Sequence, residues 1–206
     1  SNQISDLITA ITKQTVLPYE LIIIDAGSND GTLEIVKNVW IRESSNSYGC
    51  KLITDIVIDA YPGGGRNHGI KLAGTEWVVF IDSGIYPEDD WLENLWNFQQ
   101  NIDSDVIFGL CDFDSDNAVG KAVCGVAYGI GRKILTIPGS IIKKNIFQKV
   151  GFFREDLRAA EDLEWRSRYN KFYPTNFTCE SSILHYREVP ENFHDVFRKW
   201  FISAKY

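Results

Sequence analysis

Runs of large apolar residues alternate along this chain with segments whose apolar side chains recur at helical spacing. Trp77–Ile81 is a run of five apolar residues that ends at Asp82, which is the pattern of a strand buried on both faces. Leu21–Ile24 has the same form and ends at Asp25, and β-branched residues predict a further strand over 52–58. These runs predict the centre of a mostly parallel sheet.

Helical spacing predicts helices between these strands, and the alternation predicts one α/β domain over residues 1–206. The stretch 112–135 is rich in Gly and Asp without a strong period, so it predicts loops and short strands that wrap over a site. The predicted helices cover 6–13, 33–39, 70–73, 91–98, 146–150, 159–169 and 192–206. The last of them is amphipathic, with Trp200 and Phe201 opposite Arg198, Lys199 and Lys205. Further strands are predicted over 106–111 and 182–186, and a strand followed by a turn over 138–144.

Two of the predicted strands end in a carboxylate, Asp25 and Asp82. Open α/β sheets bind ligands outside the carboxyl ends of their strands, so both side chains are candidates for a ligand site. A strand-end Asp can also simply cap a turn. The glycine-punctuated segment 26–32 has the same two interpretations: a loop that holds a nucleotide, or a well-formed turn with Asp30 as the N-cap of the next helix.

Three consecutive glycines, residues 63–65, precede Arg66. Glycine is costly in backbone entropy, so the run predicts a bare loop that allows a close approach. Arg66 carries a fork of donors suited to a phosphate. The alternative is an exposed arginine on a flexible turn.

The formal net charge of −7 comes without any block of Lys or Arg, which argues against a nucleic acid partner. No stretch reaches the ~18 apolar residues of a membrane span, and the N-terminus lacks a signal pattern. The sequence therefore predicts a cytoplasmic protein, with peripheral association at the inner face of the membrane left open. The four scattered cysteines predict reduced core thiols rather than a zinc site or disulfides.

The motifs occur in the order Gln14-Thr15, Pro18, Leu21–Asp25, Gly27–Thr32, Arg66-Asn67-x-Gly69, Phe80–Ser83, Trp91-Leu92, Val150–Phe152 and Glu161-Asp162. This succession resembles the family 2 glycosyltransferases over nearly the whole chain. The resemblance implies a GT-A fold, a Rossmann-like three-layer sandwich. It also implies inverting transfer of a sugar from a nucleotide-diphosphate sugar to a glycan or lipid-linked hydroxyl acceptor, in bacterial-type surface polysaccharide or glycolipid synthesis.

The resemblance also implies a role for individual residues. Asp162 would be the general base, and we expect it to be the inward-pointing acid of the Glu161-Asp162 pair. Asp82 and His185 would bind a divalent cation, Mg²⁺ or Mn²⁺. The nucleotide sugar would be bound by Asp25, Gly27, Ser28, Arg66, Asn67, Asp82, Ser83 and Glu161.

Three features depart from the family pattern: the first strand is absent before Ser1, Ala26 replaces an acid, and Gly84 replaces the second carboxylate of the metal motif. We therefore expect the cation to bind weakly without nucleotide. Two other functions remain open. One is a relative that binds a nucleotide or glycan without turnover, and the other is a nucleotidyltransferase.

Overall fold

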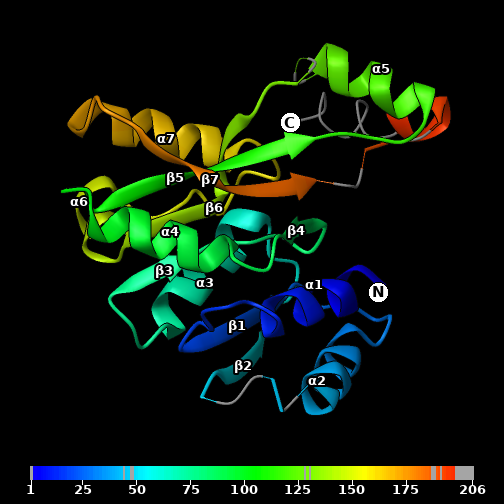
Figure 1. Ribbon diagram of the computed structural model, residues 1–206, viewed down its shortest axis with the longest axis horizontal. Coiled ribbons are helices and arrows are strands. Elements are labelled where there is room, and N and C mark those ends of the chain that lie inside the picture. The colour runs from blue at the N-terminus through cyan, green and yellow to red at the C-terminus, as the bar shows by residue number, and fades with distance from the viewer. Residues whose placement is uncertain are drawn as a thin grey trace.

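A five-stranded mixed sheet lies at the centre of the protein (Figure 1). The computed structural model describes residues 2–43, 45–46, 49–127, 129, 131–186, 189–190 and 192–197. The strands follow the order β3-β6-β5-β7-β4. They are β3 (Trp77–Val79), β4 (Ile85–Pro87), β5 (Val106–Phe113), β6 (Ile134–Lys143) and β7 (Phe177–Tyr186).

A second sheet consists of β1 (Glu20–Asp25) and β2 (Lys51–Ile56), which pair in parallel. In the larger sheet only β5 and β7 are parallel, and the other three pairs are antiparallel. The predicted α/β class is confirmed, but the predicted predominance of parallel strands is wrong. An apolar run shows that a strand is buried on both faces, whereas strand direction depends on connections that the run does not encode.

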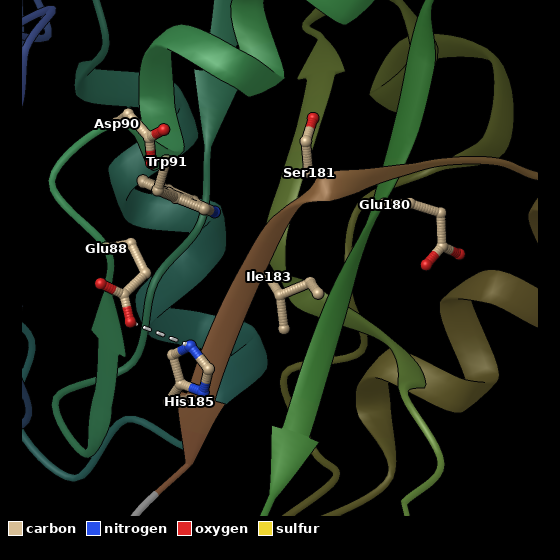
Figure 2. Close-up of a pocket in the computed structure, with 7 residues that line it drawn as sticks. All are labelled: Glu88, Asp90, Trp91, Glu180, Ser181, Ile183 and His185. Carbon is tan, nitrogen blue, oxygen red and sulfur yellow. Dashed lines mark ion pairs between the residues drawn. The ribbon is translucent and has the colours of Figure 1, made fainter.

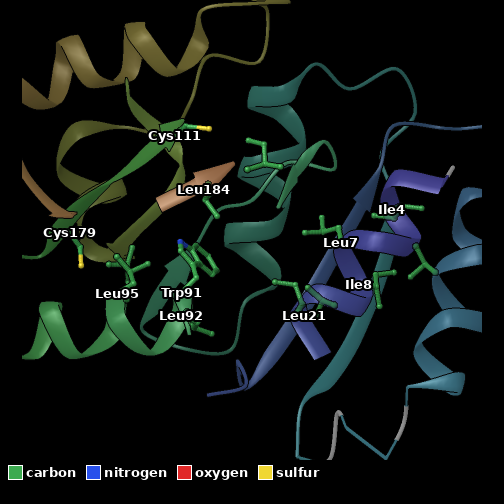
Figure 3. Close-up of a cluster of buried hydrophobic side chains, with 14 of the residues drawn as sticks. Ile4, Leu7, Ile8, Leu21, Trp91, Leu92, Leu95, Cys111, Cys179 and Leu184 are labelled. Atoms are coloured by element: carbon green, nitrogen blue, oxygen red, sulfur yellow. The ribbon is translucent and has the colours of Figure 1, made fainter. Parts of the chain in front are cut away.

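Six of the seven helices from α1 to α7 cover the two faces of the sheets, and α5 lies beyond the end of the larger sheet (Figure 1). The seven helices are α1 (Asn2–Thr12), α2 (Thr32–Arg42), α3 (Pro62–Leu72), α4 (Trp91–Gln100), α5 (Ala118–Ala127), α6 (Asn145–Val150) and α7 (Glu161–Phe172). Helices α1, α2 and α4 bury their apolar faces in one core (Figure 3), and α3, α6 and α7 bury theirs in another. This arrangement is the predicted three-layer sandwich.

Alternate side chains of β1 and β3 divide between the two cores. Ile22 and Val78 belong to the core under α3, α6 and α7, whereas Ile23 and Val79 belong to the core under α1, α2 and α4. Successive side chains of a strand point to opposite faces. The small and large sheets are therefore flanked by the same two layers of helices.

The glycines at 63–65 lie inside the first turn of α3 and not in a loop. Pro62 occupies the start of the helix, where its fixed φ favours helical geometry and its missing N–H costs no hydrogen bond. A Cβ atom at Gly63 would lie 2.3 Å from the carbonyl oxygen of Arg154, so the glycine allows a close approach between two protein segments. The close approach that we predicted is present, but its partner is the protein backbone.

Helix α5 replaces part of the loop region predicted over 112–135, and its two internal glycines and many alanines weaken the periodic signal. The predicted C-terminal helix is described only in part. Residues 193–197 are helical, while Arg198, Lys199, Trp200, Phe201 and Lys205 lie outside the described residues. Among the described helices, none is both long and apolar enough to cross a membrane.

Candidate active site

Arg66 lies between two carboxylates that come from distant parts of the chain. Its guanidinium forms an ion pair with Glu161, at the start of α7, and with Asp82, in the turn that follows β3. The Arg66 and Glu161 side chains are only 11% and 6% exposed, whereas Asp82 is 48% exposed. A largely shielded cation is thus held by one buried acid and by one acid that reaches solvent.

The two acids determine the charge state of Arg66. Burial alone would lower the pKa of the guanidinium, but the charges of Asp82 and Glu161 and their hydrogen bonds outweigh this effect and raise the pKa above its usual range. Arg66 also lies over the ring of Phe153, 5.7 Å from the centroid. Arg66 is therefore permanently charged, and an anionic ligand would have to replace the exposed Asp82 as its partner.

Glu161 and Asp162 point in different directions at the start of α7. Glu161 is buried and Asp162 is half-buried, with its Oδ1 accepting a hydrogen bond from the Leu163 N–H at 2.8 Å. The prediction that Asp162 is the inward acid is wrong, because the inward position is filled by the acid that pairs with Arg66. Asp162 instead stays accessible to a molecule arriving from solvent.

Asp25 organises the turn that follows β1. Its Oδ1 accepts hydrogen bonds from the backbone N–H groups of Gly27 and Ser28, at 2.7 and 2.6 Å, and Gly27 has a φ of 94°. Asp25 is only 6% exposed, whereas Ser28 is exposed. No hydrogen bond or ion pair among the described residues joins Asp25 to Arg66 or Asp82.

Asn67 is 1% exposed, and both hydrogens of its amide are used within the protein. Nδ2 donates to the Phe153 carbonyl oxygen at 2.8 Å and to Glu155 Oε1 at 2.9 Å, while Oδ1 accepts from the Phe153 N–H at 3.0 Å. We predicted that Asn67 binds the nucleotide sugar. The structure instead places it against the segment that leads from α6 to α7.

Ser83 is exposed in the turn after Asp82, which is closed by a hydrogen bond from the Ile85 N–H to the Asp82 carbonyl oxygen at 3.2 Å. Gly84, which stands where the family has its second carboxylate, is buried. The turn therefore presents one carboxylate, that of Asp82.

His185 lies on β7 opposite Tyr86 of β4. Its Nε2 is 3.3 Å from Glu88 Oε1, and Figure 2 shows this pair at one end of a small pocket. The pocket has a volume of about 140 Å³ and is also lined by Asp90, Trp91, Glu180, Ser181 and Ile183. The contacts described for His185 and Asp82 do not join the two side chains.

Within the described residues, no three His, Cys, Asp or Glu side chains come together as a metal site. A magnesium-like ion is commonly held by one or two carboxylates together with substrate phosphates and water. The half-exposed Asp82 fits that arrangement. It would supply one protein ligand, and a bound diphosphate would supply others.

Two pairs of polar residues that involve α3 were not predicted from the sequence. His68 of α3 contacts Asp55 at 2.7 Å, and their hydrogen bond lowers the pKa of Asp55. Asp55 lies near the end of β2. Because the predicted strand extended to residue 58, Asp55 was not recognised as a strand-end carboxylate. The pairing of Asn67 with Glu155 had no local signal, because 88 positions separate them.

Comparisons against known proteins agree with the observed fold. The family described as Glycosyl transferase family 2 matches residues 1–160, and the chain belongs to this family. It is 32% identical over 108 residues to the poly(ribitol-phosphate) beta-glucosyltransferase of Bacillus spizizenii, covering 52% of this chain and 16% of that protein. It is 25% identical over 180 residues to glycosyltransferase AglE of Haloferax volcanii, covering 82% and 57%.

Among solved structures, the chain shares the fold of S. aureus TarS. The TM-score is 0.65 at 22% identity, over 97% of this chain and 37% of that one. A crystal structure of TarS residues 1–349 in complex with UDP-GlcNAc gives a TM-score of 0.65 at 20% identity, over 93% and 56%. This chain thus spans less than two thirds of these relatives, and the likeness to TarS confirms the predicted GT-A fold.

Proposed function

We propose that the protein is an inverting glycosyltransferase that moves a sugar from a nucleotide-diphosphate sugar to a hydroxyl of a glycan or lipid-linked acceptor in surface polysaccharide or glycolipid synthesis. The observation that carries the proposal is the cluster in which Arg66 lies between Asp82 and Glu161. Glu161 directly precedes the accessible Asp162 in the chain. Family membership and the relatives named as glycosyltransferases support the same class of reaction.

The cluster provides the charges that departure of a diphosphate requires. A nucleotide-diphosphate sugar leaves its diphosphate with added negative charge, so fixed positive groups stabilise the transition state more than the ground state. Arg66 is such a group, and Glu161 holds it in place when Asp82 changes partner. A divalent cation bound by Asp82 and the diphosphate, with His185 as our proposed further ligand, would neutralise the remaining charge.

Asp162 would act on the acceptor. Inversion requires the hydroxyl to attack the anomeric carbon from the face opposite the diphosphate, with its proton passing to a base. Asp162 is adjacent to Glu161 in α7 and half-exposed, so an acceptor can reach it. The attacking oxygen forms the new glycosidic bond, the bond to the diphosphate breaks, and the proton moves to the Asp162 carboxylate.

A thermal-shift screen of UDP-, GDP- and dTDP-sugars, followed by assay of nucleoside diphosphate release, tests this proposal. A donor at ~100 times its dissociation constant should stabilise the protein by about 2.7 kcal/mol. We expect one donor class to stabilise the protein and to release nucleoside diphosphate when an acceptor is present. Pyrophosphate release from a nucleoside triphosphate would indicate a nucleotidyltransferase instead.

A second candidate function is binding of a nucleotide or glycan without turnover. It is favoured by Gly84 in place of the second metal-binding acid and by the engagement of Asp82 with Arg66. This candidate predicts stabilisation by a nucleotide sugar and no release of nucleoside diphosphate with any acceptor tested.

A further inference from the structure

The segment 150–155, which begins at the last residue of α6 and leads toward α7, is held by side chains from two different helices. Arg168 of α7 donates to the carbonyl oxygens of Val150 and Phe152, at 2.6 and 2.7 Å, and Trp165 of α7 donates to that of Gly151 at 2.8 Å. The next carbonyl oxygen, that of Phe153, accepts from Asn67 of α3 at 2.8 Å. Four consecutive carbonyl groups are therefore bound, three by α7 and one by α3.

Helix α3 contacts this segment through residues one turn apart. Asn67 binds both the N–H and the carbonyl group of Phe153, as a neighbouring strand would, and also Glu155. Gly63, four positions earlier and on the same face, lies against the Arg154 backbone, where a Cβ atom would come within 2.3 Å of the carbonyl oxygen. The contact thus requires an amide at one position and no side chain at the other.

The same two helices carry the groups proposed to perform the reaction. Arg66 precedes Asn67 in α3 and pairs with Glu161 of α7, and Asp162 follows Glu161. Because α7 and α3 both hold the segment 150–155, its position fixes where the first turn of α7 lies relative to Arg66.

We infer that Gly63 and Asn67 are positioning residues for sugar transfer. They hold the segment 150–155 against α3 and thereby place the Asp162 carboxylate relative to the donor site. This inference rests on the proposed function for its kinetic consequence. It predicts an effect on turnover and not on donor affinity, because Gly63 has no side chain and the side-chain amide of Asn67 is bound within the protein.

Two variants and a matched control test the inference. Gly63→Ala forces the Arg154 backbone away. Asn67→Asp keeps the size and the acceptor, loses both donated hydrogen bonds and places a second carboxylate against Glu155. Gly64→Ala is the control, because its Cβ atom would have its nearest neighbour at 3.7 Å, an ordinary contact. It makes the same glycine-to-alanine change in the same helical turn.

We expect Gly63→Ala and Asn67→Asp to lower kcat by about 10²-fold, the effect of a displacement of about 1 Å in a catalytic group. Donor affinity should be unchanged in both, and Gly64→Ala should match the wild-type protein in both quantities. Unchanged kcat in the two test variants, or a loss of donor affinity in step with kcat, would overturn the inference.

Hydrogen exchange tests the contact without reference to activity. In the wild-type protein the Phe153 amide should exchange as slowly as buried amides of α7, and Gly63→Ala should speed exchange over residues 153–160. Rapid exchange of the wild-type Phe153 amide would refute the inference even if the variants do not fold. If the wild-type protein releases no nucleoside diphosphate, the proposed function fails, and the exchange result still decides whether α3 holds the segment.

Discussion

One guanidinium nitrogen of Arg66 donates to both carboxylate oxygens of Asp82, at 3.1 and 3.2 Å. Asp82 is the carboxylate that the proposed function assigns to a divalent cation, so in the ligand-free protein an internal cation already compensates its charge. A metal ion must compete with Arg66 for this acid. A bound diphosphate would favour the exchange by offering Arg66 a new anionic partner and the metal further oxygens.

This competition predicts that metal binding depends on the nucleotide. Titration calorimetry with Mn²⁺ should show weak binding to the ligand-free protein and much tighter binding in the presence of the nucleoside diphosphate identified by the donor screen. Asp82→Asn should abolish the gain from the nucleotide. A tight metal site in the ligand-free protein would contradict the prediction.

The two ion pairs of Arg66 should differ in their effect on stability. Arg66→Gln leaves Glu161 buried without its partner, which should cost about 3–5 kcal/mol of unfolding free energy. Asp82→Asn removes the more exposed partner, and its cost should not exceed ~1 kcal/mol because solvent screens that pair. Urea unfolding of the two variants measures both values. Equal losses would contradict the prediction, because Arg66→Gln removes both ion pairs and Asp82→Asn removes only one.

Stability should fall as the pH rises above about 9. Burial, together with the charges of Asp112 and Asp82, raises the pKa of the Cys111 thiol to about 12 from 9.0. The thiol of the unfolded chain ionises first, so the stabilisation is complete below pH 9 and is lost as the pH rises toward 12. At pH 10 the loss from Cys111 is on the order of 1 kcal/mol.

Urea midpoints at pH 8 and pH 10 measure this loss, and Cys111→Ala should reduce the difference between them. Burial also raises the pKa of Cys50 to about 11 and that of Tyr169 to about 12, so the variant should retain part of the slope. A midpoint that is independent of pH in the wild-type protein would contradict the prediction.

The sequence was sufficient to predict most of the elements that build the fold. The buried strands that end at Asp25 and near Asp82 are present. A run of apolar residues between a charged residue and a turn has few other stable conformations in a globular protein, so its prediction as a strand was reliable. Strand direction, helix α5 and the helical state of Gly63 were not predicted. These features depend on contacts between distant segments, and a glycine-rich helix has little local preference to reveal it.

The residues of the candidate site were predicted from the sequence, but the contacts between them were not. Arg66, Asp82 and Glu161 were all predicted as ligand-binding residues, and the structure brings them together. Their mutual ion pairs were not predicted, because 95 positions separate Arg66 from Glu161. Glu161 points inward because it meets Arg66 of α3, and Asn67 has a structural role because it meets the segment 150–155. Residue type alone does not determine either contact.

Asp162 should be dispensable for binding and required for transfer. Asp162→Asn keeps the shape of the side chain and removes its capacity to accept a proton, while Arg66, Asp82 and Glu161 remain paired. Donor affinity, measured by calorimetry, should be unchanged. If Asp162 only stabilised the start of α7, the same variant would instead lose ~0.3–1 kcal/mol of stability with little change in rate.

The most direct test is the rate of nucleoside diphosphate release at saturating donor and acceptor, measured for the wild-type protein and for Asp162→Asn in parallel. We predict acceptor-dependent release by the wild-type protein and a rate lower by roughly 10²–10⁴-fold in the variant, the usual contribution of a general base. Equal rates would contradict the assignment of Asp162 as the base, and a wild-type protein that binds the donor but releases nothing would contradict the glycosyltransferase itself.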